Sequence, residues 1–67
     1  MTRIEDVVVN HAPEGSSEPA VRSYCGTLCA ERGISPEADF GRIPRDQISA
    51  VADIIGRVNK LFAPGKR

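Results

Sequence analysis

The feature that most constrains the fold of this 67-residue chain is a long amphipathic segment from Pro44 to Phe62. Its apolar residues recur at steps of three and four, the period of one face of an α-helix. Pro44 suits the first turn of a helix, and Asp46 is favourable near the positive end of the helix dipole. The apolar stripe consists of Ile48, Val51, Ile55, Val58 and Phe62, widened by Ile54 and Leu61. The segment therefore predicts a helix that buries one face.

An earlier helix is predicted from Ser17 to Gly33. Ser17 can cap the free backbone N–H groups at its start, and Pro19 is tolerated in the first turn. Glycine is favoured just past the end of a helix. The residues that share the apolar face are Val21, Cys25 and Leu28, with Cys29 or Tyr24 as a further candidate. We therefore predict an all-α fold, a small module of two helices, with three helices as the alternative.

Residues 1–16 precede these helices and have a different character. Ile4 and the run Val7 to Val9 favour a strand, and residues 11–17 are rich in turn-formers. A lone strand has no partner in so short a chain, so we expect a flexible N-terminal arm, with a short strand as the alternative. The predicted organisation is an arm or strand over 1–16, a helical domain over 17–63 and a basic tail over 64–67.

Size and charge limit the functions open to this chain. A core of about ten aliphatic side chains can only just offset the ordering entropy of so small a domain, so a partner or self-association is expected. Nine basic and nine acidic residues cancel, which argues against attraction to nucleic acid or membrane by net charge alone. The balance shifts along the chain, with six basic and four acidic residues from Glu37 onward.

Neither a secretion signal nor a membrane span is predicted. Arg3 is followed by two acidic residues, and the apolar cluster after them is only three residues long. Cys25 and Cys29 lie four residues apart in a predicted helix, where side chains share a face but seldom have disulfide geometry. We therefore expect reduced thiols in a cytoplasmic protein that does not engage a membrane.

The sequence offers little for catalysis or metal binding. His11, the only histidine, lies in the predicted loop with no ligand at metal-binding spacing. Cys25 and Cys29 leave a zinc site short of ligands unless two chains share it, so we interpret them as small core residues. No serine has a histidine base with an orienting partner. We predict no enzyme activity, no catalytic residue, no metal or cofactor and no small-molecule substrate.

The segment Phe40-Gly41-Arg42-Ile43-Pro44-Arg45 is the most informative for function. Glycine lets the backbone approach another surface closely, and the arginine beside it can extend into a narrow groove. The minor groove of AT-rich DNA is narrow and strongly negative, so it attracts a guanidinium without base-specific contacts. In the alternative interpretation, Gly41 turns the chain, Ile43 packs, Pro44 starts the helix and Arg42 is a solvated charge.

A family resemblance favours the DNA interpretation. The matching residues are Val21-Arg22-Ser23-Tyr24-Cys25, then Gly41-Arg42-Ile43-Pro44, then apolar Ile48 and Val51. This pattern, over Val21 to Ile55, resembles the C-terminal DNA-binding domain of Lsr2, an actinobacterial nucleoid-associated protein. The resemblance implies a compact two-helix unit that binds AT-rich DNA through the minor groove, with Gly41 and Arg42 matching the last two residues of the family's Arg-Gly-Arg hook.

The chain departs from that pattern at three places. Phe40 stands where the first hook arginine should be, Tyr24 replaces a tryptophan, and the connector between the helices is several residues longer. With one inserted arginine in place of two, binding should be considerably weaker.

Two functions follow as hypotheses. The first is a small nucleoid-associated, DNA-binding regulator of transcription, with Gly41 and Arg42 at the minor groove and Arg45, Arg57 and Lys60 near phosphates. The second is a protein-interaction module that dimerises or docks on a partner protein through the apolar face of residues 44–62. The part of that face expected to remain free consists of Ile54, Leu61 and Phe62.

Overall fold

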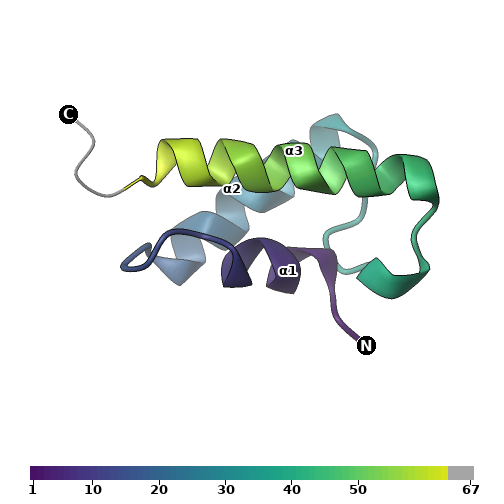
Figure 1. Cartoon of the computed structure of the whole chain (residues 1–67), viewed down its shortest axis with the longest axis horizontal. Coiled ribbons are helices and arrows are strands. Elements are labelled where there is room, and N and C mark those ends of the chain that lie inside the picture. The colour runs from purple at the N-terminus through teal and green to yellow at the C-terminus, as the bar shows by residue number, and fades with distance from the viewer. Residues whose placement is uncertain (64–67) are drawn as a thin grey trace.

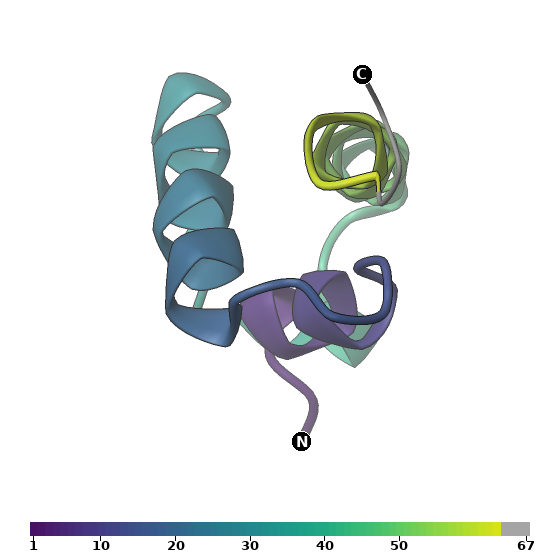
Figure 2. The same cartoon turned by 90° about the vertical axis from the view of Figure 1, so that its left-hand side faces the viewer.

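Three helices surround one core in the computed structural model, which describes residues 1–63 (Figure 1). They are α1 (Ile4–Asn10), α2 (Glu18–Glu31) and α3 (Arg45–Leu61), and a 3-10 turn, η1 (Phe40–Arg42), precedes α3. Viewed along α3, α2 stands to one side and α1 lies across the base of both (Figure 2). The all-α prediction is confirmed in its three-helix form. No helix among these residues is long and apolar enough to cross a membrane.

The N-terminal segment differs from its prediction. Residues 1–16 were expected to form a flexible arm or short strand, but Ile4–Asn10 form α1. Ile4 and Val8 are fully buried in the core. They are four residues apart and therefore share one face of a helix, which packs against both α2 and α3. Burial of that face outweighs the preference of β-branched residues for strands.

The two predicted helices are confirmed with small changes at their ends. Ser17 is the N-cap of α2, and its hydroxyl accepts a hydrogen bond from the Ala20 N–H at 3.5 Å. The helix stops before Gly33, whose φ of +68° suits glycine. Pro44 occupies the N-cap position of α3, one residue earlier than its predicted role in the first turn. The predicted basic tail, 64–67, lies outside the described residues.

The core draws on all three helices and on the residue that follows α2. Its buried members are Ile4, Val8, Val21, Cys25, Leu28, Cys29, Ile34, Val51, Ile54 and Val58. The Cys25 and Cys29 thiols are free and lie 3.9 Å apart. Burial raises the pKa of Cys25 to about 12 and also raises the pKa of Cys29, so both thiols are neutral at physiological pH. Their predicted role as small core residues is confirmed.

Most of the predicted partner face is buried inside the protein. Ile54, expected to be free for another chain, is fully buried, so that prediction is wrong. Phe62 is half-buried and packs edge-on against Tyr24, with ring centroids 6.2 Å apart. Leu61 alone of the three is clearly exposed, at 61%. The prediction assumed one covering helix, whereas α1 and α2 both cover α3.

The connector between α2 and α3 is attached to the N-terminus by backbone hydrogen bonds. The Phe40 N–H donates to the Thr2 carbonyl at 2.7 Å, and the Ile4 N–H donates to the Ala38 carbonyl at 3.0 Å. Between these bonds, Arg3 and Asp39 form an isolated antiparallel β-bridge. The residues before and at the start of α1 therefore hold the segment that leads into η1.

Gly26, in the middle of α2, gives a direct test of this helix. A Cβ built there meets no atom within 4 Å, so Gly26→Ala should stabilise the protein by about 1 kcal/mol through the higher helix propensity of alanine. Gly33→Ala is the matched control, because its positive φ should make it destabilising by about 1 kcal/mol. Urea unfolding followed by circular dichroism measures both. A Gly26→Ala variant no more stable than the parent would contradict this packing.

Candidate nucleic-acid interface

The turn η1, which carries the predicted DNA contact, is stabilised by hydrogen bonds to its own N-cap residue, Asp39. Asp39 is its N-cap, and its Oδ1 accepts a hydrogen bond from the Gly41 N–H at 3.1 Å. The Arg42 N–H donates to the Asp39 carbonyl at 3.0 Å. Phe40 and Ile43, on either side, are half-buried and pack against the core. Phe40, where the resemblance leads one to expect an arginine, therefore fastens the turn to the protein body.

Arg42 extends from this turn into solvent. Its side chain is 87% exposed, and its one ion pair within residues 1–63 joins Nε to Asp39 Oδ2 at 3.5 Å. Asp39 is partly buried, but the guanidinium of this pair is almost fully in solvent, where an ion pair contributes little free energy and Arg42 can exchange Asp39 for another anion. The guanidinium is therefore available to a ligand while its backbone stays fixed.

Gly41 is not required by the conformation of the turn. Positive φ among the described glycines occurs at Gly15 and Gly33 and not at Gly41. A Cβ at Gly41 would meet only Asp39 Oδ1, at 3.6 Å, which is an ordinary van der Waals contact. Gly41 does lie in a turn, as the alternative interpretation has it, but the backbone of that turn does not require a glycine. Its effect is to leave the surface next to Arg42 without a side chain.

Helix α3 begins three residues after Arg42 and presents a narrow solvent face. The residues of this face are Arg45, Ser49, Ala52, Gly56 and Lys60, all exposed. At about 100° per residue they fall within roughly 80° of one another around the helix axis. The face has a cation at each end and small side chains between, so it is both smooth and positively charged at its ends.

The predicted DNA-binding residues form two groups rather than one. Gly41, Arg42 and Arg45 lie together at the start of α3. With a rise of about 1.5 Å per residue, Arg57 lies about 18 Å and Lys60 about 22 Å further along the helix. A ligand that touches all five must therefore extend along the length of α3.

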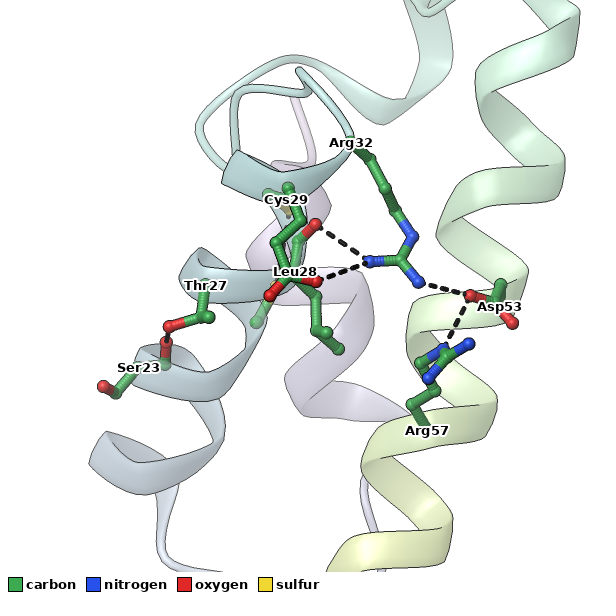
Figure 3. Close-up of polar contacts among 9 residues, drawn as sticks. Ser23, Thr27, Leu28, Cys29, Arg32, Asp53 and Arg57 are labelled. Atoms are coloured by element: carbon green, nitrogen blue, oxygen red, sulfur yellow. Dashed lines mark hydrogen bonds and ion pairs between the residues drawn. The ribbon is translucent and has the colours of Figure 1, made fainter.

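Arg57 is engaged within the protein. Its Nε donates to Asp53 Oδ2 at 2.9 Å, and the same oxygen accepts from Nη2 of Arg32 at 2.7 Å (Figure 3). The hydrogen bond from Arg57, and to a lesser extent the one from Arg32, lowers the pKa of Asp53. The Asp53 carboxylate in turn raises the pKa of Arg57. Arg32 also donates to the Leu28 carbonyl at 3.1 Å, so this cluster links the end of α2 to α3.

A shallow open pocket lies at the far end of α3. Tyr24 of α2 and Arg57, Lys60 and Leu61 of α3 line it. Leu61 is its one strongly exposed apolar residue, since the Phe62 ring is turned to Tyr24. On the apolar face predicted for a partner, Leu61 in this pocket and Ile48 near the other end of α3 are the large apolar residues that stay exposed within the described range.

Metal-ligating side chains do not converge in the part of the chain that the structure describes. No group of three or more His, Cys, Asp or Glu residues there is placed to hold a metal ion. His11 is exposed at the end of α1, and its Nδ1 lies 2.9 Å from the Val7 carbonyl oxygen.

Arg3, which is not among the predicted DNA-binding residues, also lies next to the η1 turn. It is exposed and sits opposite Asp39 in the β-bridge, beside the η1 turn. Nothing in the sequence pairs residues 3 and 39, because the bridge depends on backbone groups. No family model, curated protein or solved structure matches the chain.

Proposed function

We propose that this protein binds AT-rich DNA through the minor groove, with the Arg42 guanidinium as the inserted group. The observation that carries the proposal is the 87% exposure of Arg42 on a turn that is fixed on both sides. The resemblance of residues 21–55 to the Lsr2 DNA-binding domain supports the same function. A nucleoid-associated, regulatory role belongs to this proposal.

Preorganisation compensates in part for the single arginine. Binding loses less free energy when the contacting loop is already ordered, and here the loop backbone is held by Thr2, Asp39 and the packed ring of Phe40. The negative potential of a narrow AT-rich groove then competes with the partly buried Asp39 carboxylate for the guanidinium. Local charge rather than net charge drives this interaction, which fits a chain whose net charge is zero.

The solvent face of α3 fits a role beside the phosphates. Ser49, Ala52 and Gly56 leave room for a sugar–phosphate backbone to approach the helix, and Arg45 and Lys60 are free to neutralise it. Neither cation takes part in an ion pair with another residue of the 1–63 range. Arg57 has to release Asp53 before it can contribute, so we expect it to matter less than Lys60.

Fluorescence anisotropy with labelled AT-rich and GC-rich duplexes tests the proposal. We expect tighter binding to the AT-rich duplex, and a slope of log K against log salt of about −3 for roughly three phosphate contacts. Arg42→Ala should weaken AT-rich binding about 10- to 100-fold and reduce the preference over GC-rich DNA. Arg57→Ala, a change of the same size at an engaged arginine, is the control and should have a smaller effect.

Gly41→Ala separates binding from folding. Because the added methyl group is tolerated by the turn, the melting temperature should be unchanged, while closer DNA contact is hindered and affinity falls. Absence of binding to both duplexes, or an Arg42→Ala variant that binds like the parent, would rule the proposal out.

A second function, docking of a protein partner or a second copy, is favoured by the exposure of Leu61 beside Tyr24. This pocket joins an apolar contact to the cations Arg57 and Lys60, a combination suited to an acidic, amphipathic helix. Light scattering and affinity capture test it. A strict monomer that recovers no partner counts against it.

A further inference from the structure

We propose that Arg3 supplies a second arginine to the DNA interface, next to Arg42 and in contact with a phosphate. The proposal rests on the proposed DNA-binding function and adds a residue from the opposite end of the chain. Arg3 is exposed, with φ −77° and ψ 152°, an extended backbone just before α1.

The hydrogen bonds around the β-bridge place the Arg3 side chain. They run from Phe40 N–H to the Thr2 carbonyl and from Ile4 N–H to the Ala38 carbonyl, on either side of Arg3 and Asp39 but not between them. This is the pattern of a non-hydrogen-bonded antiparallel pair, in which the Cα atoms are about 4.5 Å apart and the side chains leave the same face. Arg3 therefore emerges beside the Asp39 carboxylate.

Asp39 is next to both arginines, opposite Arg3 in the β-bridge and in an ion pair with Arg42. Its Oδ2 lies 3.5 Å from Arg42 Nε, so Arg3 and Arg42 flank one carboxylate. Its Oδ1 already accepts the Gly41 N–H, and Arg3 makes no ion pair with a residue of the described range. One carboxylate cannot pair fully with two guanidinium groups, so one of the two arginines beside Asp39 is available to a ligand.

The other charges near Arg3 and Arg42 show why Arg3 matters for the charge balance of this surface. Arg45 adds a cation at the start of α3, and Asp46 adds an exposed carboxylate in the first turn. With Glu37, exposed two residues before Asp39, this end of the molecule carries three arginines, Arg3, Arg42 and Arg45, and the three carboxylates Glu37, Asp39 and Asp46. Without Arg3, these carboxylates would outnumber the arginines.

The backbone of Arg3 is also fixed, which limits the entropy lost on binding. The next residue, Ile4, is fully buried, and the hydrogen bonds on both sides hold the main chain. Only the side chain has to be ordered by a ligand. The arginine is thus suited to a phosphate that borders the groove entered by Arg42.

Arg3→Gln, Arg3→Lys and Arg42→Ala, compared in the same anisotropy titrations over a range of salt concentrations, test the proposal. Arg3→Gln should weaken binding about five- to tenfold on AT-rich and GC-rich duplexes alike and make the salt slope shallower by about one. Arg3→Lys should retain most of the affinity because it keeps the charge. The melting curves of the Arg3→Gln and Arg3→Lys variants should match that of the parent, since the bridge uses only backbone atoms of residue 3.

The outcomes separate the two proposals. If the parent binds and Arg42→Ala weakens it, but Arg3→Gln binds with unchanged affinity and slope, the role of Arg3 is overturned and the DNA-binding function stands. If Arg3→Gln lowers the preference for AT-rich over GC-rich duplexes instead of the overall affinity, Arg3 does not act through a phosphate and this proposal is overturned. If the parent binds neither duplex, both proposals fail together.

Discussion

Ile4→Ala is expected to remove most of the stability of this protein. The side chain is fully buried, and truncation of a buried isoleucine to alanine destabilises by about 2 to 5 kcal/mol. A domain of this size rarely has more than about 3 to 5 kcal/mol in total. The variant should therefore be largely unfolded at room temperature, which the loss of the helical circular dichroism signal would reveal.

Val7→Ala is the matched control for this result. Val7 lies in the same short helix as Ile4 and is also a β-branched residue that favours strands. It is only half-buried and lies outside the packed core. It should lower the free energy of unfolding by less than about 1 kcal/mol. Equal stability of the two variants in urea titrations would show that α1 does not pack as described and that residues 1–16 are an arm.

The second large effect is expected from Ile54→Asp. The substitution places an unpaired carboxylate at a fully buried position, where desolvation of the charge costs several kcal/mol. We expect no cooperative thermal transition for this variant at neutral pH. If Ile54 lay on a free partner face, as the stripe in the sequence indicated, the monomer would tolerate the charge.

Leu61→Asp makes the same chemical change two turns later on α3. Because Leu61 is 61% exposed, this variant should fold with a melting temperature close to that of the parent. Scanning calorimetry of the pair is the measurement. A folded Ile54→Asp variant, or an unfolded Leu61→Asp variant, would contradict the assignment of these positions to the core and the surface.

The two longer helices were predictable because their signals are local. Ser17 and Gly33 bracket α2 through capping and backbone preference, and Pro44 marks the start of α3. The candidate interface was predictable in part for the same reason, since Gly41, Arg42 and Arg45 are neighbours in the chain. Arg57 and Lys60 were grouped with them by charge alone, and the length of α3 separates them.

What the sequence by itself determined is the all-α class, the bounds of α2 and α3 to within about two residues, and the place of Cys25 and Cys29 in the core. These follow from helical periodicity and end-capping, which act over a few residues.

Only the tertiary structure decided that residues 4–10 are a helix, that Ile54 is buried and that Arg3 lies beside Asp39. Each of these depends on contact with a segment far away in the chain. Burial of Ile4 and Val8 against two helices outweighs a strand preference, and the backbone bonds that place Arg3 involve no side chain whose identity could have revealed them.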